Sequence, residues 1–281
     1  MELVYRSSVN RWECDENDHL NVRFYVAKHM EALAAGLLRL GVAAQVLENL
    51  HAHVTSHHLR FLQESRISTP LSGYCAVVSI QADASTLLTE LRHSSTDAVL
   101  CTCLHHLSCG LPSGVVTAAV PEHAQPRGIT APLNIDNLQG DLGQRGFRRI
   151  GLGCISAAEV AASGHLLMQH YMGRLSDSMP HLWAALRGEA FDGVEGGAVL
   201  EYQLRYHQTL AAGMPYEVWS GLAQASAKVL RMVHLIKRPD TGQICVAAET
   251  IGVRMDLTLR KAIVFDAAAQ EKMRAQEVRI D

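Results

Sequence analysis

The sequence predicts an α+β fold in which an antiparallel sheet wraps around one long helix, and it predicts that this arrangement occurs twice within the 281 residues. Two observations carry the prediction. A long segment with the apolar spacing of a helix is followed by several short strand-like segments. After a proline-containing connector, the same order of segments starts again at an almost constant distance along the chain.

The first half reads as strand, turn, helix and then further strands. Residues 4–12 have strand character, and residues 24–40 have helical spacing that ends at Gly41, a residue type favoured just after a helix. The apolar face of this helix consists of Val26, Met30, Leu33, Leu37 and Leu40. Strand-like segments follow at 53–62, 74–82, 87–93 and 98–108, as expected for an antiparallel meander.

The composition changes over residues 110–144, which contain four prolines and scattered glycine, asparagine and aspartate. We expect this connector to run over the surface. A second helix is predicted over 167–186, bent near Pro180, with strands at 198–206, 216–223, 228–237 and 244–255. The predicted limits are residues 1–110 for the first unit, 111–147 for the connector and 148–281 for the second unit.

Direct comparison of the halves supports a duplication. The segment H-L-N-V-R-F-Y at 19–25 aligns with H-L-L-M-Q-H-Y at 165–171, and H-L-R-F-L-Q at 58–63 aligns with Q-L-R-Y-H-Q at 203–208. The offset stays at 145 or 146 residues across separate elements. A constant offset of this kind indicates that a whole domain was duplicated.

The segment 13–25 carries the chemistry that the sequence suggests. Asp15 and His19 lie four residues apart on a polar turn, and Asn21 is a favoured residue type to open the helix that follows. A carboxylate and an imidazole at the N-terminus of a helix can together activate water and stabilise an oxyanion. An ordinary polar turn before a capped helix is the plain alternative.

An acidic turn followed by histidine, asparagine and tyrosine at the start of a long helix resembles the motif of the hotdog-fold acyl-CoA thioesterases. The 4-hydroxybenzoyl-CoA thioesterase branch, with its pattern D-x-D-x-x-G-H-V-N-N-x-x-Y, is the most similar. The matching positions are Asp15, His19, Asn21 and Tyr25. The departures are Glu13 for the first aspartate, Asp18 for the glycine, Leu20 for the valine and Val22 for the second asparagine.

The resemblance implies two tandem hotdog units in one chain and hydrolysis of an acyl-CoA thioester. It implies that Asp15 acts as nucleophile or as general base, that His19 assists it, and that the helix N-terminus polarises the thioester carbonyl. Asn21, Tyr25 and Glu31 are predicted to contact the substrate.

The second copy of the motif is degraded. Glu159, His165 and Tyr171 remain, but Ala161 stands at the position of Asp15 and Leu167 at that of Asn21. We therefore expect the first half to be catalytic and the second to complete the fold and the substrate groove.

Two other functions remain open at this point. An enoyl-CoA hydratase of the double-hotdog type also pairs an aspartate with a histidine, but it spaces them five residues apart and carries the site in the second unit, where this chain has Ala161. A non-catalytic acyl-CoA binding module is the other alternative, and the presence of Asp15 argues against it.

Composition limits the remaining possibilities. The chain is 48% hydrophobic and 19% charged, with a net charge of −3, which favours a globular protein with no affinity for nucleic acid or an anionic membrane. We see no apolar run of the roughly 18 residues that a membrane span needs. Seven cysteines without the spacing of a disulfide scaffold, and no secretory leader, predict a cytoplasmic location.

We predict no metal and no cofactor other than the coenzyme A of the substrate. Cys101, Cys103 and His105 would share one strand face in extended spacing, too far apart to converge on one ion. The cluster of His51, His53, His57 and His58, with His58 on the opposite strand face, is expected to line a surface or groove and not to bind a metal. The expected partners are an acyl-CoA and a second copy of the chain in a homodimer of double-hotdog chains. The acyl group, and acyl carrier protein instead of coenzyme A, stay open.

Overall fold

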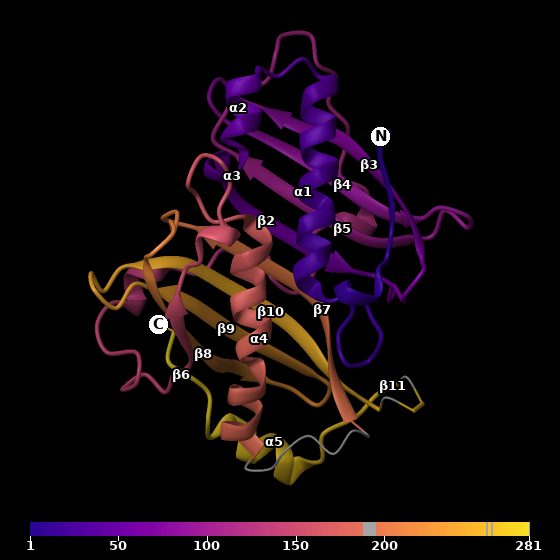
Figure 1. Cartoon of the computed structure of the whole chain (residues 1–281). Coiled ribbons are helices and arrows are strands. Elements are labelled where there is room, and N and C mark those ends of the chain that lie inside the picture. The colour runs from indigo at the N-terminus through magenta and orange to yellow at the C-terminus, as the bar shows by residue number, and fades with distance from the viewer. Residues whose placement is uncertain (188–194, 257, 260, 281) are drawn as a thin grey trace. The chain divides into compact units, whose positions relative to one another are not determined.

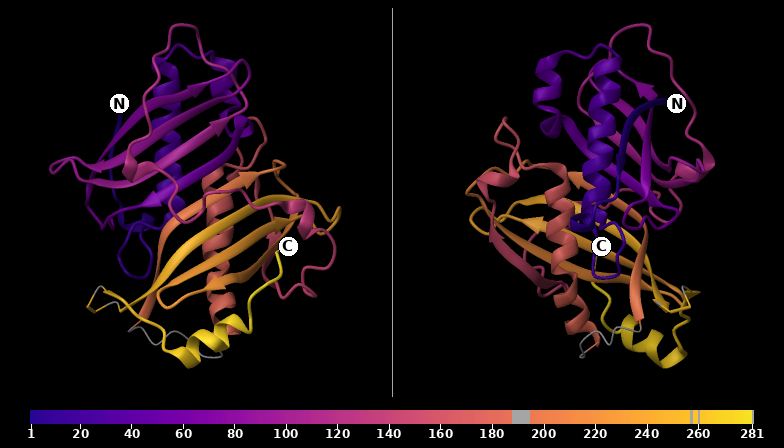
Figure 2. Two further views of the ribbon diagram at one scale, coloured as in Figure 1. Left: turned by 180° about the vertical axis from the view of Figure 1, so that it is seen from behind. Right: turned by 45° about the vertical axis from the view of Figure 1, so that its right-hand side comes forward.

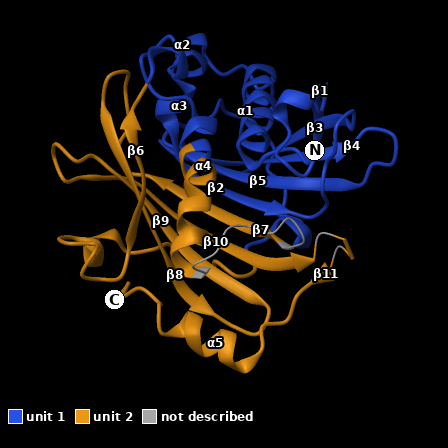
Figure 3. Cartoon of the chain, turned by 60° about the horizontal axis from the view of Figure 1, so that its bottom comes forward, with its two compact units in different colours: residues 1–126, 156–173 blue, residues 127–155, 174–281 orange. Residues whose placement is uncertain are grey.

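The computed structural model describes residues 1–187, 195–256, 258–259 and 261–280 (Figure 1). The chain forms two compact units. Unit 1 comprises residues 1–126 and 156–173, and unit 2 comprises residues 127–155 and 174–281 (Figure 3). Each unit contains one antiparallel sheet and helical segments, so the predicted α+β class is confirmed.

The sheet of unit 1 has the strand order β1-β3-β4-β5-β2, with every neighbouring pair antiparallel. The strands are β1 (Glu2–Ser8), β2 (Val54–Phe61), β3 (Pro70–Ile80), β4 (Ser85–His93) and β5 (Val99–Leu107). Helix α1 (Val22–Arg39) lies across one face of this sheet, as both views of Figure 2 show. Two short helices, α2 (Ala44–Glu48) and α3 (Leu50–His53), lead from α1 to β2.

The predicted apolar face of α1 is the face that packs on the sheet. Val26, Met30, Leu33 and Leu37 are all buried, whereas Leu40 is the half-buried C-cap. Gly41 follows with φ of 76°, a left-handed conformation that glycine adopts without strain, and this confirms it as the helix stop.

The sheet of unit 2 has the strand order β7-β10-β9-β8-β6, again antiparallel throughout, with β11 (Lys261–Ala262) paired to β10. The strands are β6 (Arg148–Cys154), β7 (Glu195–Tyr206), β8 (Pro215–Ala225), β9 (Val229–Lys237) and β10 (Ile244–Asp256). Helix α4 (Met168–Arg187) continues through Pro180. In unit 2 the guanidinium of Arg174 on α4 lies 5.0 Å from the ring centroid of Tyr216 on β8. A last helix, α5 (Ala267–Arg274), follows.

The structural elements repeat with the offset that the sequence predicts. Strands β1 and β6, the 3-10 helices η1 (Arg11–Glu13) and η4 (Ala157–Glu159), and the first residues of α1 and α4 are all separated by 146 residues. Strands β3 and β8 are separated by 145. Strand β1 ends earlier than predicted because Asn10 turns the chain and caps η1. Strand β6 was not predicted.

The connector does not simply follow the surface, so that expectation is wrong for several of its residues. Leu138, Leu142 and Phe147 are buried and pack with Val233 and Leu235 in the core of unit 2. The short helices η2 (Glu122–Ala124) and η3 (Ile135–Leu138) lie within this segment. A connector can therefore supply core residues even where its composition is that of a loop.

None of the helices in the described part of the chain is long and apolar enough to cross a membrane. All seven cysteines are free thiols, in agreement with the absence of a disulfide scaffold from the sequence.

Candidate active site

The Asp15 carboxylate is bonded to the backbone of the turn between η1 and α1. Its Oδ1 accepts hydrogen bonds from the backbone N–H of Asn17 at 2.9 Å and of His19 at 3.1 Å. The backbone N–H of Asp15 donates to the carbonyl of His19 at 2.8 Å, and Asp18 has φ of 58°, where the family pattern has glycine. Oδ2 accepts no hydrogen bond from the residues that the structure describes. Asp15 is half-buried, so one oxygen holds the turn and the other remains open to a ligand.

Asn21 is the N-cap of α1, as predicted. Its side-chain oxygen accepts the N–H of Arg23 at 2.9 Å, and its carbonyl accepts the N–H of Phe24 at 2.9 Å. Val22, the first helical residue, donates its N–H to no group in the described part of the chain. The first turn of α1 therefore presents one open N–H together with the positive end of the helix dipole.

The segment that follows β2 holds the turn against the sheet. Leu20 donates its N–H to the carbonyl of Ser65 at 2.8 Å, and His19 forms an isolated bridge with Arg66. The Nε2 atom of the His19 imidazole lies 3.4 Å from a carboxylate oxygen of Glu64. The backbone of His19 thus orients Asp15, while its side chain faces Glu64.

Tyr25 is buried one turn into α1. Its hydroxyl accepts the N–H of Ser65 at 3.2 Å, and its ring packs edge-on against Phe61 at a centroid distance of 5.2 Å. Burial raises the pKa of the Tyr25 phenol well above its usual value. This side chain therefore anchors the segment that holds His19 and Leu20.

Glu31 does not join this group. It is exposed on α1, nine residues beyond Val22, which corresponds to about 13 Å along the helix axis. Its neighbour is Tyr5 of β1, whose pKa is raised to about 12, first by burial and further by the Glu31 charge. Asp15, His19 and Asn21 thus share one turn, Tyr25 reaches it through Ser65, and Glu31 lies apart.

A buried ion pair beneath the turn was not predicted. Glu13 is bonded to Lys28 of α1 at 2.8 Å, and Lys28 also donates to the carbonyl of Ser8 at 3.2 Å. The Lys28 side chain is only 3% exposed. The spacing of Glu13 and Lys28 carries no local signal, because their contact depends on how β1 meets the helix.

The second copy of the motif has the same backbone form. Ala161 donates its N–H to the carbonyl of His165 at 2.8 Å, and Gly164 has φ of 82° at the position equivalent to Asp18. Ala161 brings no carboxylate. The N–H of Met168, the equivalent of Val22, is occupied by Nδ1 of His51 at 3.3 Å. The second copy therefore lacks both the carboxylate and the open N–H of the first.

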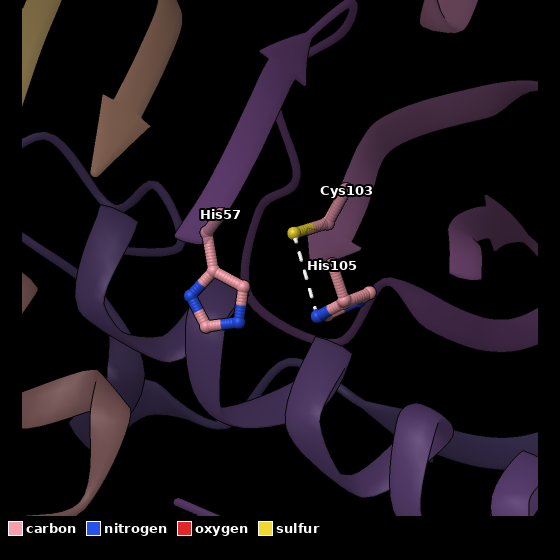
Figure 4. A group of neighbouring side chains, drawn as sticks. All are labelled: His57, Cys103 and His105. Atoms are coloured by element: carbon pink, nitrogen blue, oxygen red, sulfur yellow. Dashed lines mark hydrogen bonds between the residues drawn. The ribbon is translucent and has the colours of Figure 1, made fainter. Parts of the chain in front are cut away.

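A group of side chains from several elements of unit 1 is buried behind α1. His57 of β2 and His105 of β5 are directly opposite in the strand ladder, and Cys103 lies next to His105 on the same strand face (Figure 4). His57 is 1% exposed, so the expectation that it lines a surface or groove is wrong. His51 and His53 belong to α3 and not to the strand.

The family model described as "Thioesterase-like superfamily" matches residues 9–127 and again 155–273. None of the curated proteins compared with the chain matches its sequence. The two matched segments each contain one copy of the motif.

Three solved structures illustrate the fold. A putative oleoyl thioesterase from Lactobacillus plantarum is 12% identical, with a TM-score of 0.63 over 89% of this chain and 94% of that one. A 12:0-ACP thioesterase from Umbellularia californica is 10% identical, with a TM-score of 0.62 over 89% of this chain and 93% of that one. An acyl-ACP thioesterase from Bacteroides thetaiotaomicron is 10% identical, with a TM-score of 0.60 over 88% of this chain and 96% of that one. The tandem hotdog architecture is therefore confirmed.

Proposed function

Because the chain belongs to the thioesterase-like superfamily and is a thioester hydrolase, we propose that it is an acyl-CoA thioesterase with one active site, located at the turn of residues 13–22. One observation carries the location. Of the two motif copies, the first combines the open Oδ2 of Asp15 with the open N–H of Val22, whereas the second has neither.

Asp15 supplies the attacking group in this proposal. As general base, its carboxylate takes a proton from a water molecule that attacks the thioester carbonyl. As nucleophile, it forms an acyl anhydride that water then hydrolyses. Both routes convert the thioester and one water into a carboxylic acid and a free thiol. The two hydrogen bonds to Oδ1 fix the direction in which Oδ2 points.

The N–H of Val22 is the donor for the developing oxyanion. A donor aimed at that charge typically contributes about 10²–10³ in rate, and the partial positive charge of the helix N-terminus adds to it. Asn21 leaves this donor open because its side chain bonds Arg23 instead. His19 and Tyr25 act as positioning residues in this arrangement, and Glu31 would contact only a part of the substrate distant from the carbonyl.

The proposal also specifies which carrier holds the acyl group. We propose coenzyme A, whereas two of the solved structures similar in fold are named as thioesterases for acyl carrier protein. A panel of acyl-CoA and acyl carrier protein thioesters of increasing chain length, with free thiol detected by a colorimetric reagent, separates the two carriers. Faster hydrolysis of the carrier-protein thioesters at every chain length would contradict the choice of coenzyme A.

The variant that tests the site is Asp15→Asn. An asparagine oxygen can still accept the two turn N–H groups, so the fold should persist, as circular dichroism would verify. We expect kcat to fall by at least about 10²-fold. The matched control is Glu159→Gln in the second copy, which should keep kcat within about twofold.

Retention of full activity in Asp15→Asn would contradict the proposed site. Absence of thiol release from any thioester, combined with hydration of crotonyl-CoA, would contradict thioester hydrolysis and support the hydratase class instead.

We also propose that the chain forms a homodimer of double-hotdog chains in the cytoplasm. Light scattering coupled to size-exclusion chromatography should give twice the mass of one chain. The mass of a single chain at micromolar concentration would contradict the dimer.

A further inference from the structure

Five polar side chains from four elements of unit 1 converge between α1 and the sheet, and the proposed hydrolysis uses none of them. They are His29 of α1, His57 of β2, Thr89 of β4, and Cys103 and His105 of β5, each at most 1% exposed. Burying an imidazole removes its hydrogen bonds to water, which is unfavourable unless the group acquires partners. The first repeat thus concentrates three imidazoles and one thiol, all metal-ligating groups, at one buried place outside the proposed active site.

The donor atoms of three of these residues are close enough to share one ion. One ligand atom from each of His57, Cys103 and His105 lies within 4.8 Å of the other two. The Cys103 Sγ atom is 3.8 Å from Nδ1 of His105 (Figure 4). In a tetrahedral zinc site, a sulfur and a nitrogen ligand lie about 3.6 Å apart.

Thr89 contacts one ring nitrogen of each of two histidines. Its Oγ1 lies 2.7 Å from Nδ1 of His29 and 2.7 Å from Nε2 of His105. A hydroxyl oxygen has two lone pairs and can accept both N–H groups. When Thr89 accepts both N–H groups, the lone pairs lie on Nδ1 of His105 and Nε2 of His29. The first faces Cys103, and the second is buried without a hydrogen-bond partner among the described residues.

This arrangement has the form of a metal site with its supporting hydrogen bonds. A histidine that binds a metal usually donates its other N–H to an oxygen, which fixes the ring.

The corresponding positions in the second repeat do not form such a cluster. They are Leu175, Tyr202, His234, Ala248 and Thr250. The single imidazole there, His234, is bonded to the hydroxyls of Ser220 at 2.8 Å and Thr250 at 3.2 Å. One buried histidine is thus satisfied by two hydroxyls. The additional histidines and the thiol belong to the first repeat alone.

We propose that His57, Cys103 and His105 form a buried site for one thiophilic d10 cation, Zn²⁺ or Cu⁺. Thiolate and imidazole ligands without a carboxylate select these ions over Mg²⁺ or Ca²⁺. Binding replaces the Cys103 S–H bond by a metal–sulfur bond and releases one proton. With one thiolate, a site holding Cu⁺ is electrically neutral, whereas one holding Zn²⁺ keeps a charge of +1. Because the donors are buried, the ion enters during folding.

The test measures metal content of the full chain folded in the presence of Zn²⁺ or, under reducing anaerobic conditions, of Cu⁺. After removal of weakly held ions with a chelator, we expect close to one ion per chain in the wild type from one of the two arms. Cys103→Ser should retain less than about a tenth of that. Cys101→Ser is the matched control, since Cys101 is equally buried on the same strand, and it should retain the full amount.

Equal retention by Cys103→Ser, or no retained ion in the wild type from either arm, would overturn the proposal. X-ray absorption at the metal edge of the wild type tests the site without a variant. We expect one sulfur at about 2.3 Å and nitrogen ligands at about 2.0 Å. A ligand set without sulfur would overturn the site even if Cys103→Ser failed to fold.

Discussion

The two copies of the motif have the same backbone and different chemistry. Both begin with a 3-10 helix closed by a capping box, both fold a short turn with a left-handed residue, and both lead into a long helix. In the first copy, Asp15 and the N–H of Val22 are open to a ligand. In the second, Ala161 replaces the carboxylate and His51 occupies the N–H of Met168.

The comparison teaches that the turn keeps its shape without the carboxylate of Asp15. The backbone bond between residues 15 and 19 is 2.8 Å, and so is the equivalent bond between residues 161 and 165, although only the first turn has an aspartate. Turn geometry is therefore maintained by the backbone and by the left-handed residue, Asp18 or Gly164. The hydrogen bonds that Oδ1 of Asp15 accepts are an addition of the first copy, and the proposed chemistry uses Oδ2.

The largest difference in stability between the copies should come from the contacts of Glu13 and Glu159 beneath the turns. Lys28→Met leaves the Glu13 carboxylate without its cation, which typically costs about 3 kcal/mol for a buried pair. Glu159→Gln breaks a more exposed contact of 3.5 Å to His170 and should cost less than about 1 kcal/mol. Urea denaturation measures both. Equal effects would show that the two turns are anchored alike.

The next effect is a pH dependence of the free energy of unfolding. It comes from His51, which accepts the Met168 N–H of the second copy. Burial, with further contributions from His165 and His170, lowers the pKa of His51 to about 4 from 6.5. Between these values the unfolded chain binds a proton that the folded chain does not, so the free energy of unfolding falls as the pH falls from 6.5 to 4. We expect His51 to account for about 2 kcal/mol of that decrease.

His51→Asn isolates this contribution, because an asparagine oxygen can accept the Met168 N–H but does not titrate. Its free energy of unfolding should fall less than that of the wild type over the same pH interval. Parallel pH profiles for the two proteins would show that His51 titrates normally in the folded chain.

The smallest effect on stability and kcat should come from Tyr25→Phe. It removes the acceptor of the buried Ser65 N–H, which costs about 1–2 kcal/mol. We expect lower stability in urea with kcat reduced by less than about tenfold. A loss of kcat beyond 100-fold with unchanged stability would show that the phenol takes part in the chemistry.

Features encoded by local periodicity could be predicted from the sequence. The apolar spacing of Val26, Met30, Leu33 and Leu37 identified the face of α1 that packs on the sheet, and Gly41 identified its end. The constant offset identified the duplication. The match of Asp15, His19 and Asn21 to a family pattern placed them on one turn, which the structure also shows.

Features that depend on the register between strands could not be predicted. The sequence places Cys103 and His105 on one face of a strand, two residues apart. It does not show that His57 lies opposite His105, because the register of strand pairing is determined by the whole sheet. The contact of His51 with Met168 joins residues that are 117 positions apart. The connector residue Leu138 enters the core for the same non-local reason.

The measurement that tests the account most directly removes one backbone N–H from each copy. Proline is tolerated at the first position of a helix, and Asn21 already has the extended conformation that a following proline requires. Val22→Pro should therefore keep the fold and lower kcat for thioester hydrolysis by about 10²–10³-fold. Met168→Pro, at the equivalent position of the second copy, should leave kcat within about twofold. Equal losses in the two variants, or full activity in Val22→Pro, would contradict a single active site at the first copy.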